Sequence, residues 1–129
     1  MDGRGIVLFA HGSRDARWRE PVEAVARRVA ELDPRAAVRC AYLELATPDL
    51  AQAVAELAAG GARTVRVVPL FLGIGRHLRE DLPGLMDGLR QAWPGLAFEL
   101  APPVGESPAL IDLMARLALQ ESNIRDGIT

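Results

Sequence analysis

Residues 65–77 read VRVVPLFLGIGRH, and this stretch combines the two features that decide the fold. Its first half is a largely apolar run rich in valine, which is typical of a strand covered on both faces of a parallel sheet. Its second half is a glycine-rich turn that ends at His77. In open parallel sheets, ligands bind beyond the carboxyl ends of the strands. We therefore expect the chemistry of this protein to lie where the run ends.

The same arrangement occurs near the start of the chain. Residues 6–14 read IVLFAHGSR, a short apolar run followed by His11, Gly12 and Ser13. A short apolar run that is bounded by a turn indicates a buried strand. The first strand is therefore predicted at residues 6–10, and a polar turn follows it directly.

The segments between and beyond these strands alternate in pattern. Apolar residues at helical spacing predict an amphipathic helix over residues 18–32, which Pro34 terminates. Further strands are predicted at residues 37–43, 65–71 and 96–100, and further helices at residues 77–93 and 108–120.

A helix is also predicted between the second and third strands. Thr47 is its expected N-cap, Pro48 its first helical residue, and Gly60 and Gly61 its end. The complete order is βαβαβαβα, which implies a four-stranded parallel sheet with helices on both faces, a flavodoxin-like α/β fold. We expect one domain over residues 1–121 and a flexible C-terminal tail over residues 122–129.

Composition excludes several classes of protein. Half of the 129 residues are hydrophobic and a quarter are charged, which is the balance of a globular domain. A net charge of −2 argues against a general nucleic-acid binder. No apolar stretch approaches the ~20 residues that span a membrane, and no signal peptide is evident, so a cytoplasmic location is expected. The single cysteine, Cys40, excludes an intrachain disulfide and is expected to fill the core.

The two histidines of the chain fall on the same predicted edge. His11 follows the first strand and His77 follows the third, and these strands are neighbours in a doubly wound sheet. Neutral imidazoles bind Zn, Fe, Co and Ni, and two of them leave coordination positions open for a substrate. Each histidine could instead be a hydrogen-bonded loop residue. Glu44, after the second strand, could be merely solvated, and the nearby arginines could be surface residues.

Three other functions fit the same residues. A metal carrier would need the histidines alone. A flavodoxin-like module would bind phosphate or flavin at this edge, although residues 73–77 match no Walker or dinucleotide fingerprint. A phosphoryl-transfer enzyme would use His11 as nucleophile and would leave His77 without a role.

Five short segments together resemble a known family. They are LFAHGSRD at residues 8–15, YLELATP at 42–48, VPLFLGIGRH at 68–77, DLP at 81–83 and PPVG at 102–105. The chain resembles, from about residue 5 to 120, the small sirohydrochlorin chelatases of cobalamin and sirohaem synthesis, the CbiX-type class II chelatases. His-Gly-Ser after the first strand combined with Gly-x-Gly-Arg-His after the third is a specific pair of motifs.

The resemblance implies an activity and its residues. It implies a chelatase-like fold and an ATP-independent lyase without an organic cofactor, which inserts Co²⁺, or Fe²⁺ or Ni²⁺, into the tetrapyrrole sirohydrochlorin. The metal ligands correspond to His11 and His77, and Glu44 corresponds to a catalytic acid or base, acting in its own subunit or across a homodimer. Small members of the family are half the length of two-lobed chelatases, which implies a homodimer that binds neither nucleic acid nor membrane. The residues expected to bind the substrate carboxylates are Gly12, Ser13, Arg14, Gly75, Arg76 and Arg79.

Overall fold

The computed structural model describes residues 3–120. They form four strands, four α-helices and two short 3-10 helices. In chain order these are β1 (Arg4–Ala10), η1 (Ala16–Arg19), α1 (Glu20–Leu32), β2 (Ala37–Tyr42), α2 (Leu50–Ala59), β3 (Thr64–Pro69), α3 (Arg76–Ala92), β4 (Ala97–Leu100), η2 (Val104–Glu106) and α4 (Pro108–Leu119). The predicted βαβαβαβα order is confirmed. The expected tail at residues 122–129 and the domain boundary before it lie outside the described residues.

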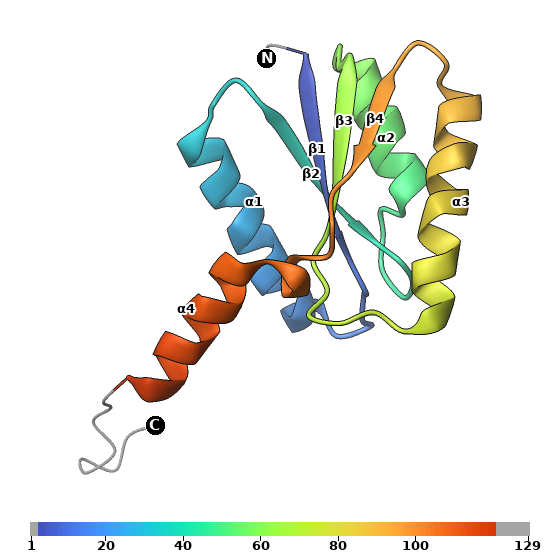
Figure 1. Ribbon diagram of the computed structural model, residues 1–129. Helices are drawn as coiled ribbons and strands as arrows, with labels where there is room; N and C mark the ends of the chain where they lie inside the picture. Colours follow the sequence, from blue (N-terminus) through green and yellow to red (C-terminus); the bar gives the residue numbers. More distant parts are fainter. Residues whose placement is uncertain (1–2, 121–129) are drawn as a thin grey trace.

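The strands form one parallel sheet in the order β2-β1-β3-β4. β1 and β3 are direct neighbours, as the sequence predicted, and their register pairs Leu8 with Val68. Because all four strands run in the same direction, the loops that follow them gather at one edge of the sheet (Figure 1). This edge carries both histidines.

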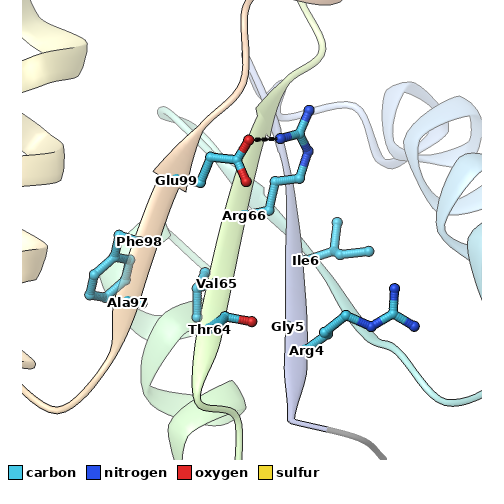
Figure 2. Close-up of a pocket in the computed structure, with 9 residues that line it drawn as sticks. All are labelled: Arg4, Gly5, Ile6, Thr64, Val65, Arg66, Ala97, Phe98 and Glu99. Atoms are coloured by element: carbon cyan, nitrogen blue, oxygen red, sulfur yellow. Dashed lines mark hydrogen bonds and ion pairs between the residues drawn. The ribbon is translucent and has the colours of Figure 1, made fainter.

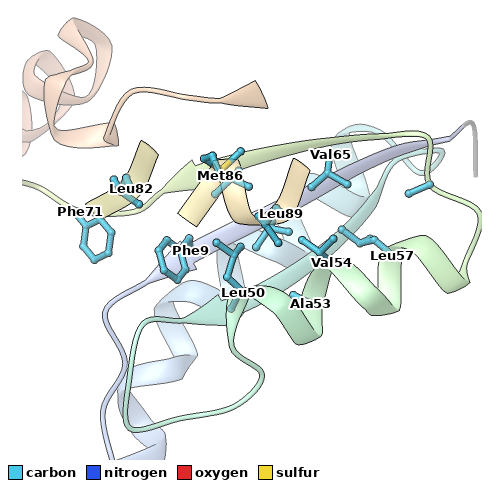
Figure 3. Close-up of a cluster of buried hydrophobic side chains, with 14 residues drawn as sticks. Phe9, Leu50, Ala53, Val54, Leu57, Val65, Phe71, Leu82, Met86 and Leu89 are labelled. Atoms are coloured by element: carbon cyan, nitrogen blue, oxygen red, sulfur yellow. The ribbon is translucent and has the colours of Figure 1, made fainter. Parts of the chain in front are cut away.

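The main hydrophobic core lies between the sheet and helices α2 and α3 (Figure 3). Strand residues that alternate along β1 and β3 point into it, as the two-residue period of a strand requires. The apolar stripes of α2 and α3 meet them. The fully or nearly fully buried members include Val7, Phe9, Val54, Leu57, Val65, Val67, Leu82, Met86 and Leu89. This core fixes the positions of β1 and β3, and so the positions of the loops that follow them.

The opposite face of the sheet is only partly covered. α1 packs on β2 and β1, and its apolar stripe is at most half-buried, with Val25 42% exposed. α4 follows β4 but extends away from the sheet instead of packing on this face (Figure 1). Helices therefore lie on both faces as predicted, but the face beside α1 stays open over β3 and β4.

Two predicted helix boundaries were wrong. The second helix starts at Leu50, and its N-cap is Asp49, whose side chain accepts a hydrogen bond from the backbone N–H of Gln52. The Gln52 side chain in turn accepts from the Asp49 N–H, so a complete capping box outcompetes Thr47 as cap. The helix predicted over residues 18–32 is divided into η1 and α1, because Asp15 caps a separate short helix at Arg17.

Two other expectations change in detail. Cys40 is only half-buried in β2, beneath α1, so it is not a core residue. The strand predicted at residues 65–71 runs instead from Thr64 to Pro69, and Phe71 is buried in the loop beyond it. Within residues 3–120, no helix is long and apolar enough to cross a membrane.

Candidate metal centre

Three side chains that could bind a metal ion or accept a proton follow three adjacent strands of the sheet. His11 comes directly after β1, Glu44 shortly after β2, and His77 is the second residue of α3, beyond β3. Since β1 lies between β2 and β3 in the sheet, the loop with His11 is central.

His11 contacts Glu44 directly. Its Nε2 atom lies 3.3 Å from Oε1 of Glu44, and both side chains are more than half exposed. The backbone holds them together, because the Glu44 N–H donates to the carbonyl of His11 and the Leu43 N–H to that of Ala10. The His11 ring also stands edge-on to Phe71, with ring centroids 6.2 Å apart. The loops after β1, β2 and β3 therefore meet at His11.

Gly12 makes this meeting possible. Its φ angle is +101°, and a Cβ atom at this position would lie 1.8 Å from the carbonyl oxygen of Glu44. No side chain fits at that distance, and L-residues rarely adopt this conformation. The Gly of the His-Gly-Ser motif therefore lets the loop that bears Glu44 approach the loop that bears His11.

His77 lies beside the loop that follows β2. It lines a shallow cleft together with Leu43, Leu78 and Leu85, and Leu43 is the neighbour of Glu44, which contacts His11. Gly75 is the N-cap of α3, and no side chain caps this helix end. The structure places His77 at a helix N-terminus, as predicted.

The described residues contain no group of three or more His, Cys, Asp or Glu side chains that could hold a metal ion. The edge therefore offers at most a sparse ligand set. Two imidazoles, and the carboxylate beside one of them, leave most of a coordination sphere open. Such an arrangement suits a metal that passes through rather than a structural ion. Cys40 is no candidate ligand, because burial and, second, the charge of Glu23 raise the pKa of its thiol.

The structure distinguishes among the predicted substrate-binding arginines. Arg14 and Arg76 are exposed at the edge. Arg79 is engaged, since its Nη2 atom donates to Oε2 of Glu106 at 3.1 Å. Glu106 belongs to η2 and was not among the predicted site residues. Only the tertiary structure brings it to Arg79, and no local sequence signal indicates the pair.

The expected anion site at Gly12 and Ser13 does not form at a helix N-terminus. η1 begins three residues later, and its N-cap is Asp15, whose own carboxylate occupies the Arg17 N–H. The Ser13 hydroxyl accepts from the Asp15 N–H at 3.1 Å. Hydrogen bonds from the Arg17 side chain, and then from its backbone, hold the pKa of Asp15 below its usual value. The N-terminus of η1 is therefore already capped by the Asp15 carboxylate.

The CbiX family model matches residues 5–121, which span the sheet and the loops of this edge. The chain belongs to the CbiX family. The sirohydrochlorin cobaltochelatase of Methanopyrus kandleri is 36% identical over 88 residues, which cover 68% of this chain and 61% of that protein. The chloroplastic sirohydrochlorin ferrochelatase of Arabidopsis thaliana is 30% identical over 88% of this chain and 50% of its own length.

Solved structures extend the CbiX comparison to the fold. A cobalamin biosynthesis CbiX protein from Marinobacter aquaeolei VT8 matches with a TM-score of 0.76 and 41% identity, covering 89% of this chain and 93% of that one. The sirohydrochlorin chelatase SirB of Bacillus subtilis subspecies spizizenii, solved in complex with cobalt, has the same fold with a TM-score of 0.74 at 21% identity. This chain covers 50% of SirB. It spans between half and just under two thirds of the length of the first curated relatives that it matches.

Exposed apolar residues form a rim at this edge of the CbiX-family chain, and sequence analysis did not predict it. They lie in the segments that follow β1, β2 and β3: Trp18 in η1 (70% exposed), Leu43 (37%), Leu45 (51%) and Leu72 (67%). Leu45 has a φ angle of +61°, a conformation that non-glycine residues rarely adopt and that is often found at functional sites. Leu45 and Leu72 were a usable signal, because each is an apolar residue just beyond the end of a predicted strand.

Proposed function

We propose that this chain is an ATP-independent sirohydrochlorin chelatase that inserts a divalent metal ion into the tetrapyrrole. The observation that carries the proposal is the contact between His11 and Glu44, with His77 flanking the same loop at the edge of a CbiX-family sheet. The names of the relatives, cobaltochelatase and ferrochelatase, support the same chemistry.

His11 and His77 are the proposed donors that present the metal to the macrocycle. Both are exposed, so their imidazole nitrogens are accessible from solvent. With two protein donors, the remaining positions of the ion stay open to the pyrrole nitrogens. As the metal moves into the ring, the imidazoles are exchanged for those nitrogens.

Metal insertion releases two protons. The divalent ion replaces the two pyrrole N–H protons, so the ring charge is balanced and the protons need an acceptor. Glu44 is suited to this task because its carboxylate is exposed and lies 3.3 Å from Nε2 of His11. We propose that it takes the protons as general base and passes them to solvent.

The macrocycle offers flat apolar faces and a periphery of carboxylates. The apolar rim formed by Trp18, Leu43, Leu45 and Leu72 suits the faces. Arg14 and Arg76 are free to clamp carboxylates by charge-assisted hydrogen bonds. Arg79 would exchange Glu106 for a substrate carboxylate, so its contribution requires opening of an existing ion pair.

Cobalt is the proposed physiological metal, with Fe²⁺ and Ni²⁺ as the alternatives, because imidazole suits all three. We propose that the active form is a cytoplasmic homodimer. Its support is the length comparison: this chain covers half of SirB and half of the Arabidopsis ferrochelatase. Membership of the CbiX family favours this function over a flavodoxin-like module or a phosphoryl-transfer enzyme.

The test is an anaerobic absorbance assay of sirohydrochlorin with Co²⁺, and then with Fe²⁺. We expect insertion faster than the uncatalysed background and lost in both His11→Ala and His77→Ala. Arg35→Ala, an exposed arginine at the opposite end of the sheet, is the matched control for Arg14→Ala and Arg76→Ala. Metal binding without any acceleration of insertion would rule out the chelatase activity and would indicate a metal carrier instead.

A further inference from the structure

A pocket lies between His11 and the start of α1. Its volume is about 250 Å³, and its walls come from several parts of the chain. His11 belongs to the turn after β1, Tyr42 ends β2, Leu70 follows β3, and Trp18 and Arg19 belong to η1. A water molecule needs only about 10–15 Å³ of such space, so the pocket can hold a substituent of several atoms. It therefore offers room for a ligand group beside one of the two candidate metal ligands.

Arg19 brings a positive charge to the wall of this pocket. Its side chain is half-buried. Within residues 3–120, its guanidinium makes no hydrogen bond or ion pair. A guanidinium that is partly removed from water is stabilised by an anion, and a carboxylate matches its planar, forked donors. Since no Asp or Glu side chain lines the pocket, a ligand has to supply that anion.

Other arginines that line pockets already have a carboxylate partner. In the pocket over β1, β3 and β4, Arg66 is joined to Glu99 across two strands (Figure 2). Arg4 lines the same pocket and pairs with Asp33. The chain itself therefore neutralises the arginines of that pocket, whereas it leaves the charge of Arg19 uncompensated. This difference favours the pocket beside His11 as a site for an anion.

The charge of Arg19 has no role in starting α1. Arg19 is the N-cap residue of this helix, but its side chain makes no capping hydrogen bond. A cation is unfavourable at this end of a helix, where the dipole is positive. Burial, first of all, and then the charges of Cys40 and Glu23 raise the pKa of the Tyr42 hydroxyl. The positive charge of Arg19 lowers the same pKa, so it acts on the pocket wall. The guanidinium and the helix dipole together attract an anion to the pocket.

Trp18 borders the opening of the pocket, because it lines the pocket and is 70% exposed. We propose that the pocket receives one carboxylate arm of the tetrapyrrole, with the carboxylate bound by Arg19 and the edge of the ring packed against Trp18. An aromatic side chain suits a flat ring, and Val22 and Leu70 suit the methylene groups of the arm. An arm held here keeps the ring beside His11. The inference rests on the proposed chelatase function and adds a substrate-binding residue to it.

The first test measures the binding of metal-free sirohydrochlorin by quenching of tryptophan fluorescence. The chain has two tryptophans, so a Trp93→Phe background leaves Trp18 as the reporter. Arg19→Gln is expected to raise Kd about tenfold, as the loss of a charged hydrogen bond does, and Arg19→Lys should restore part of the affinity. Arg27→Gln, at an exposed arginine further along α1, is the matched control and should leave Kd unchanged. An unchanged Kd in Arg19→Gln, or an equal loss in Arg27→Gln, would overturn the proposal.

The second test separates substrate binding from a structural role. In the insertion assay, Arg19→Gln should raise KM for sirohydrochlorin about tenfold and leave kcat within about twofold, because Arg19 contacts an arm and not the pyrrole nitrogens. The midpoint of urea denaturation should stay unchanged, since the side chain caps nothing. A lower kcat with an unchanged KM would contradict the proposal.

The two proposals fail in different ways. If wild type inserts metal and Arg19→Gln keeps its KM, only the Arg19 site is removed. If wild type binds sirohydrochlorin through Arg19 but does not accelerate insertion, only the chelatase activity is removed. A wild type that does not bind sirohydrochlorin would overturn both.

Discussion

Gly12 and Glu44 show how single residues define the candidate centre. The carbonyl of Glu44 lies where any side chain at position 12 would be, while the Glu44 carboxylate contacts His11. The backbone of Glu44 therefore requires glycine at position 12, while its side chain completes the candidate site. Substitutions of Gly12 and of Glu44 separate these two contributions.

Gly12→Ala is expected to destabilise the fold. The positive φ alone costs a residue with a Cβ atom about 1–2 kcal/mol, and the contact with the Glu44 carbonyl adds to this. Gly84→Ala is the matched control: position 84 lies inside α3 with open space around it, so alanine should stabilise by about 0.5–1 kcal/mol. Chemical denaturation measures both. Equal effects of the two substitutions would argue against the close approach at Gly12.

Glu44→Gln separates an enzyme from a metal carrier. The amide keeps the shape of the side chain but cannot accept protons, so we expect the rate of metal insertion to fall about 10²-fold or more. Co²⁺ affinity, measured by calorimetry, should change little because both imidazoles remain. An unchanged insertion rate would exclude Glu44 as the general base, and Asp49→Asn provides a control carboxylate further along the same loop.

At the scale of elements, the start of a helix depends on which polar residue occupies the N-cap position. Thr47 was the N-cap predicted for α2, but Asp49 holds that position. Asp49 prevails because Gln52 completes a reciprocal pair of hydrogen bonds with it. The same competition explains η1, where Asp15 caps a short helix before α1 begins.

Asp49→Ala should therefore destabilise the protein by about 1 kcal/mol, because it removes the cap of a helix whose apolar side forms the core. Asp87→Ala is the control. Asp87 is an exposed residue of α3 that pairs with Arg90, and its loss should change the free energy of unfolding by less than about 0.5 kcal/mol. Thermal and urea denaturation of the two variants side by side provide the measurement. A cap at Thr47 would instead leave Asp49→Ala as harmless as the control.

At the scale of the whole molecule, the two faces of the sheet differ. One face is closed by α2 and α3 and contains the buried core. The other is covered only in part by α1, while α4 extends into solvent (Figure 1). An uneven sandwich of this kind should be less stable as a single chain than as a pair.

The melting temperature of wild type should accordingly rise with protein concentration, because association stabilises the folded state by mass action. Scanning calorimetry across a hundredfold range of concentration measures this. The double variant L113E/L117E, which places charges on the exposed apolar face of α4, should melt at a lower temperature that does not change with concentration. A concentration-independent melting temperature for wild type would show that the single chain is the stable unit.

The sequence by itself determined the order of strands and helices along the chain, the adjacency of β1 and β3, and the edge that carries both histidines. These follow from apolar periodicity and from the right-handed crossover of parallel strands, which are properties of local pattern and chain direction. They are visible in residues 6–14 and 65–77 without any knowledge of what packs against them.

Only the tertiary structure decided the contact of His11 with Glu44, the engagement of Arg79 by Glu106, and the outward course of α4. Each depends on residues far apart in the chain, such as Gly105 against the backbone of Leu72. Local propensity cannot encode such a contact, because the conformation of these loop residues depends on what packs against them. The periodic segments therefore revealed the layers, while close backbone approaches between loops set the site and the position of the last helix.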